Sequence, residues 1–125
     1  MHRPIHTDQA PAAIGPYSQA ILANDTLYVS GQTPLIPETM AVVAPDIVSQ
    51  TRQSLKNIKA IVEAAGFTVS DIVKCTVFLK DMNDFAAMNG EYLAFFGAHK
   101  PARSTVEVAR LPKDVRVEID AVCVR

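Results

Sequence analysis

The sequence predicts an α+β fold in which a mixed sheet of five to six strands carries two helices on one face. Two segments repeat apolar residues every three or four positions, as helices do, and five others show the alternation or the branched side chains of strands. Their order is strand, strand, helix, strand, helix, strand, strand. Two helices cannot cover both faces of so wide a sheet, so we expect them on one face. The length suits a single domain, residues 1–125.

The first two strands are expected to form a hairpin around Asn24-Asp25. Residues 27–30 alternate Leu and Val with Tyr and Ser, and Gly31 and the prolines after it end the run in a loop. Residues 17–24 form the partner strand, and Asn24-Asp25 supplies the turn between the two.

The first helix is expected to follow Pro45. Asp46 can accept a hydrogen bond as the N-cap, and apolar residues recur at helical spacing from Ile47 to Ala65. Gly66 then suits the left-handed conformation that ends many helices. These signals predict one amphipathic helix.

The second helix is expected within residues 83–97, where Phe, Met and Tyr recur at helical spacing until Gly97. Gly90 lies inside this helix, at a cost of about 1 kcal/mol relative to alanine. A glycine at such a position indicates a tight contact.

The strand between the helices, residues 71–81, is apolar on both faces. Alternation places Val73, Cys75, Val77 and Leu79 on one face, and Ile72, Lys74, Thr76 and Phe78 on the other. A strand of this kind needs cover on both sides, and the chain has no further elements to supply it. We therefore expect a homo-oligomer.

Residues 101–120, PARSTVEVARLPKDVRVEID, are expected to form two short strands around a Pro-Lys-Asp turn. Each strand has a polar face of three residues: Arg103, Thr105 and Glu107 on the first, and Arg116, Glu118 and Asp120 on the second. In one interpretation both faces are solvated and exchange surface ion pairs worth at most about 1 kcal/mol each. In the other they line a pocket. Periodicity alone leaves both open.

The residue types favour the pocket. The guanidinium of Arg103 matches a substrate carboxylate through two parallel hydrogen bonds, and the carboxylate of Glu118 could hold a water or carry a proton. Hydroxyls from Tyr17 and Ser30 and the bare backbone of Gly31 would complete a site for hydrolysing a C=N bond in a small carboxylate.

The composition argues against several other classes. A net charge of −1 without a basic run gives no reason to expect nucleic acid or a membrane surface as a partner, and no apolar run is long enough to span a membrane. Cys75 and Cys123 are expected to be buried free thiols, which suits the cytoplasm. His2 and His6, on a mobile terminus, and His99 lack metal-ligand spacing, so we expect no metal site.

The chain resembles the RidA (YjgF) family of reactive-intermediate deaminases from about Pro11 onward. The resemblance is carried by AIGPYSQA, LYVSGQTPLIP, NIKAIVEAAG, DIVKCTVFLKDMNDFAAMNGEYLAFF and PARSTVEVARLPKDVRVEIDAVCVR. It implies a chorismate-mutase-like homotrimer with pockets between subunits. It also implies hydrolysis of enamines and imines such as 2-aminoacrylate to the 2-keto acid and ammonia, with no metal and no organic cofactor.

The resemblance also implies roles for individual residues. Arg103 would bind the substrate carboxylate and Glu118 the attacking water, while Tyr17, Ser30 and Gly31 would line the pocket.

Asn89, in the MNGEY segment, is a further candidate for the pocket. Thr105 also belongs to the predicted site, at a position where the family commonly has cysteine, so a role for an ionisable sulfur there is excluded. The loop GAHK before Pro101 is shorter than in familiar members, which leaves the preferred substrate open.

Three alternatives remain at this point. The first is a deaminase of a larger catabolic enamine such as 2-aminomuconate, and the second is a non-catalytic regulator that binds a keto acid or an amino acid. The third is a ribonuclease or translation inhibitor, against which the nearly neutral charge argues.

Overall fold

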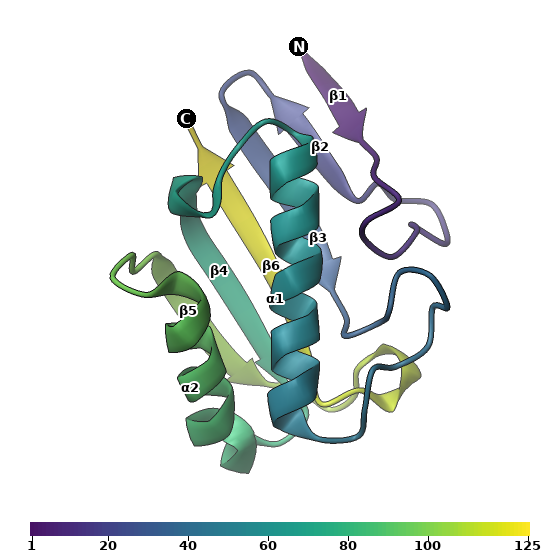
Figure 1. Cartoon of the computed structure of the whole chain (residues 1–125), viewed down its shortest axis with the longest axis vertical. Coiled ribbons are helices and arrows are strands. Elements are labelled where there is room, and N and C mark those ends of the chain that lie inside the picture. Colours follow the sequence, from purple (N-terminus) through teal and green to yellow (C-terminus); the bar gives the residue numbers. More distant parts are fainter.

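The computed structural model describes residues 1–125 and has one six-stranded sheet with two helices on one face (Figure 1). The elements are β1 (His2–Ile5), β2 (Ala20–Ala23), β3 (Thr26–Gln32), α1 (Ile47–Ala64), β4 (Ile72–Leu79), α2 (Phe85–Phe96), β5 (Ala102–Glu107) and β6 (Val117–Val124). The strand order is β1-β2-β3-β6-β4-β5, and only β4 and β5 run parallel. The predicted mixed sheet and α+β class are confirmed.

The last two strands do not form the predicted hairpin, because β4 lies between β5 and β6. The chain leaves β4, passes through α2 and returns as β5 parallel to β4, since parallel neighbours need a crossover element. Residues 108–116 then cross the end of β4, and β6 enters the centre of the sheet between β3 and β4. Arg103 and Glu118 are therefore separated by a whole strand.

The N-terminal region contains one predicted feature and one that was missed. The β2–β3 hairpin is confirmed, with Ala23 opposite Thr26 and a left-handed Asn24 in the turn, at φ 54°. The expected mobile terminus is wrong, because His2–Ile5 pair with β2 as the edge strand β1. Pro4 lowers the strand signal of this segment, yet proline is tolerated at a sheet edge where its nitrogen needs no partner.

Helix α1 begins and ends where its capping residues predict. The carboxylate of Asp46 accepts a hydrogen bond from the Ser49 amide at 2.9 Å, and Gly66 follows α1 at φ +83°. The predicted tight contact at Gly90 is wrong within this chain, since a Cβ built there meets no atom within 4 Å.

The two faces of β4 are covered unequally. Cys75, Val77 and Leu79 are buried, as predicted for one face, but Val73 is 43% exposed and Ile72 is buried in its place. The pairing with β6 shifts between Ile72 and Lys74, and such an irregularity exchanges the sides to which successive residues point. Alternation alone could not have predicted this shift.

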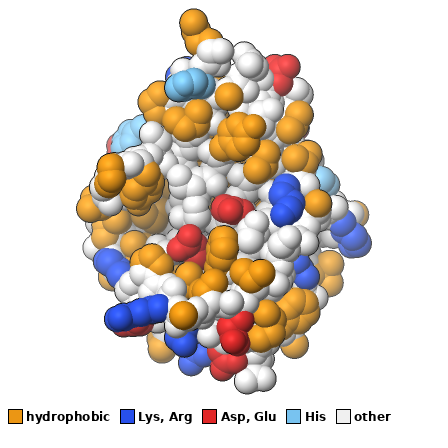
Figure 2. All heavy atoms as spheres, turned by 180° about the vertical axis from the view of Figure 1, so that it is seen from behind, with side chains coloured by type: hydrophobic (Ala, Val, Ile, Leu, Met, Phe, Trp, Pro, Cys, Tyr) orange, Lys and Arg blue, Asp and Glu red, His pale blue; other side chains and the backbone are white.

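The face of the sheet opposite the helices has no cover from this chain (Figure 1). Tyr28, Val106 and Val124 are exposed there by 40–53%. Figure 2 shows this side, on which apolar side chains surround a hollow that also contains acidic groups. A sheet with an uncovered apolar face favours association with another molecule.

Candidate functional site

Arg103 lies on the helix side of β5, beneath α2. Its strand neighbour is Cys75, a buried residue of the same side. The Nη1 group donates a hydrogen bond to Asn89 Oδ1 at 2.7 Å, and the guanidinium carbon lies 4.7 Å from the ring centre of Tyr92 and 5.5 Å from that of Phe85. Helix α2 therefore supplies one hydrogen bond and two aromatic faces that hold the cation in place.

A cavity of about 380 Å³ opens beside this guanidinium. Its lining includes Asn89, Tyr92, Phe96, His99, Lys100 and Arg103, and contains no carboxylate. The short loop before Pro101 forms one wall and is held by His99, whose Nε2 donates to the carbonyl of Ile72 at 2.7 Å. A cavity lined by the basic side chains of Lys100 and Arg103 and by no acid suits a carboxylate.

Thr105 lies two residues further along β5 on the same side, opposite Val77. Its Oγ1 is buried without a hydrogen-bond partner, as is the hydroxyl of Tyr92. Burial raises the pKa of the nearby Cys75 thiol to about 11, so this thiol is not ionised near neutral pH.

Glu118 lies on the other side of the sheet. Its neighbours along β6, Val117 and Ile119, point to the helices and are fully buried, so Glu118 points to the uncovered face. Burial, and secondarily the charge of Asp120, raise the pKa of its carboxyl above the ordinary value. A raised pKa lets this carboxyl hold a proton more readily than an ordinary glutamate does, as is common for groups that transfer protons in functional sites.

Gly31 gives Glu118 the space it occupies. A Cβ built on Gly31 would lie 2.9 Å from the carboxyl carbon of Glu118 and closer still to its Oε2. Strand β3 carries one extra residue between Val29 and Gln32 relative to β6, and this bulge includes Gly31. Only glycine allows so close an approach.

Tyr17 and Ser30 complete this second group. The hydroxyl of Ser30 donates to the carbonyl of Ser18 at 2.6 Å, while Tyr17 is 54% exposed. Both line a cavity of about 740 Å³ together with Gly31 and Glu118. The structure thus brings four of the predicted site residues together.

The seven predicted residues form two groups on opposite faces of the sheet. Arg103 pairs in register with Cys75 of β4, which points to the helices, and Glu118 pairs with Phe78, which points away from them. Within one chain, Arg103 and Glu118 therefore do not line a common pocket. We call the group of Asn89, Arg103 and Thr105 the arginine half-site, and the group of Tyr17, Ser30, Gly31 and Glu118 the glutamate half-site.

Among the residues of the larger cavity that sequence reasoning missed, Gln19 and Lys113 hold its loops in place. Gln19 is 2% exposed, although glutamine is usually found at the surface. Lys113 adopts a left-handed φ of 56° and donates to the carbonyl of Met40 at 3.0 Å. No spacing pattern marks either residue. The structure shows no group of three or more potential metal ligands, and none of its helices is long and apolar enough to span a membrane.

The helices on one face and the open sheet on the other define a small two-layer α+β protein. A family model described as endoribonuclease L-PSP, the RidA (YjgF) family, matches residues 7–125. The chain belongs to this family.

Relatives match over nearly the whole chain. A 2-iminobutanoate/2-iminopropanoate deaminase of Salmonella typhimurium is 59% identical, covering 100% of this chain and 99% of the relative. The crystal structure of the Escherichia coli YjgF gene product is 58% identical with a TM-score of 0.94, covering 98% of both chains. Escherichia coli TdcF with bound serine is 51% identical with a TM-score of 0.94, also covering 98% of both.

Proposed function

We propose that this protein hydrolyses 2-imino acids and their enamine tautomers to 2-keto acids and ammonia, as a 2-iminobutanoate/2-iminopropanoate deaminase does. The observation that carries the proposal is the guanidinium of Arg103, which Asn89 and two aromatic rings hold beside an open cavity. Its remaining N–H groups make no other side-chain bond in the chain and match the two oxygens of a carboxylate. The identity of 59% to a relative of that name supports the same chemistry here.

In the proposed reaction Arg103 binds the carboxylate and Glu118 activates a water. As the water oxygen bonds to the imine carbon, the carboxylate of Glu118 accepts one water proton, and the C=N electron pair moves to nitrogen, which takes up a proton from solvent. Glu118 then donates its proton to this amine nitrogen, and the C–N bond breaks to release ammonia. The hydroxyl returns its proton to solvent as it becomes the keto group. The raised pKa of Glu118 suits both proton transfers.

The other predicted residues have supporting roles in this mechanism. The hydroxyls of Tyr17 and Ser30 and the backbone at Gly31 border the reacting nitrogen and water, and Thr105 lies beside Arg103 on the same side of β5. Asn89 acts through Arg103 as a positioning residue, because its amide oxygen holds the guanidinium. Since the imine is already reactive, most of the rate gain comes from placing the groups correctly.

The site is complete only when two copies of the chain meet. We propose a homotrimer in which the arginine half-site of one copy faces the glutamate half-site of the next. Two observations support this assembly: the half-sites lie on opposite faces of the sheet, and apolar side chains are exposed on the face that carries Glu118. In a closed ring each copy contributes one half of two different sites.

Mixing two inactive variants tests both the chemistry and the assembly. Arg103→Ala and Glu118→Gln are each purified, then unfolded and refolded together in equal amounts. If the site forms between copies, random assembly leaves about a quarter of the interfaces with both residues intact and restores about a quarter of wild-type activity. Activity is measured as ammonia released from 2-iminopropanoate generated by an amino-acid oxidase. Full activity of either variant alone overturns the mechanism, and a mixture as inactive as its parts overturns the shared site.

Binding of an amino acid without turnover is a second candidate, favoured by the serine bound in the TdcF structure. An arginine that holds a carboxylate would serve this function equally well. Calorimetric binding of serine together with an ammonia release no faster than the spontaneous rate would favour it over the deaminase.

We further propose that residues 1–125 act as one domain in the cytoplasm, without a cofactor and without nucleic acid or membrane partners. Cys75 and Cys123 are buried free thiols, which suits a reducing compartment. The nearly neutral net charge of −1 gives RNA no electrostatic attraction despite the name of the family.

A further inference from the structure

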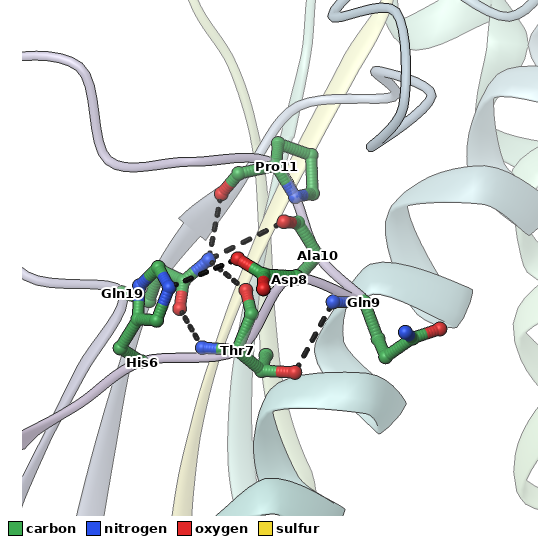
Figure 3. Close-up of polar contacts among 7 residues, drawn as sticks. All are labelled: His6, Thr7, Asp8, Gln9, Ala10, Pro11 and Gln19. Carbon is green, nitrogen blue, oxygen red and sulfur yellow. Dashed lines mark hydrogen bonds and ion pairs between the residues drawn. The ribbon is translucent and has the colours of Figure 1, made fainter.

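Gln19 is a buried glutamine that connects the N-terminal segment to the start of β2. Its Oε1 accepts a hydrogen bond from the Thr7 amide at 2.8 Å, and its Nε2 lies 3.0 Å from the Thr7 carbonyl, 3.4 Å from that of Ala10 and 2.8 Å from that of Pro11 (Figure 3). One side chain therefore bonds to residues 7–11 as a neighbouring strand would. A buried amide with every group satisfied is costly to remove.

The same residue also contacts the glutamate half-site through its backbone. The carbonyl of Gln19 accepts a hydrogen bond from the Ser30 amide at 2.9 Å, and the adjacent Ser18 carbonyl accepts one from the Ser30 hydroxyl at 2.6 Å. Gln19 thus links residues 7–11 to the strand that carries Ser30 and Gly31.

The hydrogen bond from Gln19 to Pro11 closes a short loop that forms one wall of the 740 Å³ cavity. Residues 12–18 contain only one backbone hydrogen bond of their own, from the Tyr17 amide to the Gly15 carbonyl at 2.9 Å. The cavity is lined on this side by Pro11, Ala12, Ile14 and Tyr17. The shape of this largely apolar wall therefore depends on Gln19.

We propose that Gln19 is a positioning residue that determines which imine side chains the site accepts. This inference rests on the proposed deaminase function. The wall that Gln19 holds presents Ile14 and the ring of Tyr17, which suit an apolar substrate side chain, whereas Arg103 and Glu118 bind the groups common to all 2-imino acids. Loosening the wall lowers kcat/KM for large apolar substrates more than for small ones.

The variant Gln19→Glu tests the inference with a built-in pH control. A carboxylate at position 19 cannot donate to the three carbonyls that it faces, whereas the protonated acid retains one donor. At pH 8 we expect the ratio of kcat/KM for the imine of leucine to that for 2-iminopropanoate to fall about tenfold, mainly through the KM of the larger imine. Lowering the pH to 6 should recover part of the kcat/KM that the variant has lost for the imine of leucine.

The other ionisable groups near Gln19 are the same in the wild type and in Gln19→Glu. Comparing the two proteins at each pH therefore isolates the effect of position 19. Tyr17, Lys113 and Glu118 line the same cavity, and His6 and Asp8 are exposed on the segment that Gln19 holds. Gln9→Glu is the matched control, because the exposed side chain of Gln9 makes no hydrogen bond (Figure 3). The same charge change at position 9 is expected to leave kcat/KM unchanged for both imines.

A second variant and a direct measurement keep the test decisive. Gln19→Met keeps the volume of the side chain but removes its hydrogen bonds and adds no ionisable group. The loss of selectivity between the two imines should therefore be the same at pH 6 and pH 8. Hydrogen–deuterium exchange in residues 7–18 should accelerate in both Gln19 variants and not in Gln9→Glu. Equal losses for both imines, or unchanged exchange, overturn the inference. Absence of imine turnover in the wild type overturns the proposed function, and exchange then still decides whether Gln19 holds the segment.

Discussion

The two half-sites are held in place by different means. Arg103 lies on a strand of a compact strand–helix–strand unit, with its charged group held by side chains of one helix, Asn89, Tyr92 and Phe85. Glu118 also lies on a strand, but the groups around it come from a bulge and from loops, which Gln19 and Lys113 hold by bonds to backbone carbonyls. The comparison suggests that the arginine half-site provides a fixed anchor, and that the glutamate half-site provides the adjustable part.

The largest expected effect comes from removing the anchor. Arg103→Ala loses two charge-assisted hydrogen bonds to the carboxylate, each worth about 1.5–3 kcal/mol, so kcat/KM should fall at least about 100-fold. Arg110→Ala is the matched control, because Arg110 is exposed and pairs only with Asp114. Steady-state ammonia release measures both variants. Comparable losses in the two would indicate that overall charge, and not the anchor, is responsible.

A smaller effect is expected from displacing the carboxylate of the other half-site. A Cβ in Gly31→Ala would overlap Glu118, so kcat should fall about 10- to 100-fold while the carboxylate anchor keeps KM nearly constant. Gly90→Ala is the control, since a Cβ there meets nothing, and it should stabilise the helix by up to about 1 kcal/mol. A rise in KM without a fall in kcat would contradict the role assigned to Gly31.

Removing the aromatic support of Arg103 should have a moderate effect. Tyr92→Leu loses a cation–π contact worth about 0.5–2 kcal/mol, which corresponds to a rise in KM of about two- to thirtyfold. Tyr92→Phe keeps the ring and removes a buried hydroxyl without a partner, so it should leave KM unchanged and preserve or improve stability. Substrate titration measures the KM of Tyr92→Leu and Tyr92→Phe, and thermal unfolding measures their stability. Equal KM values in both variants would show that the ring does not support the guanidinium.

The smallest effect concerns stability. The folded chain raises the pKa of Glu118, so it binds that proton more tightly than the unfolded chain, and stability from this group is lost as the pH rises through the raised value. Glu118→Gln should therefore raise Tm by a few degrees at pH 7, and the difference should vanish below the ordinary carboxyl pKa of about 4.3. A Tm difference independent of pH would contradict the burial of this charge. In the wild type, activity should fall as the pH is lowered, because protonated Glu118 cannot accept a proton from water.

Local signals in the sequence predicted where each helix and strand lies better than which elements lie beside one another in the sheet. Asp46 and Gly66 marked the ends of α1, and Asn24-Asp25 marked the hairpin, because capping and turn preferences depend on a few adjacent residues. The edge strand β1 was missed, since its stability comes from pairing with β2, to which its own residues give no clue.

The candidate site shows the same limit. The chemistry of the residues and the family resemblance identified the groups, but the pairing of β5 with β4 decided that Arg103 and Glu118 lie on opposite faces. Strand order is a long-range property, and neighbours in sequence need not be neighbours in the sheet. Gln19 was missed for a related reason, because its carbonyl partners become neighbours only after folding.

The placement of Arg103 and Glu118 has a consequence for the working concentration of the proposed enzyme. A lone folded chain holds both groups but cannot present them to one molecule, so dilution that separates the copies would abolish turnover while each chain stays folded. Specific activity would then report the association constant, and any agent that loosens the contact between copies would act as an inhibitor without approaching the substrate.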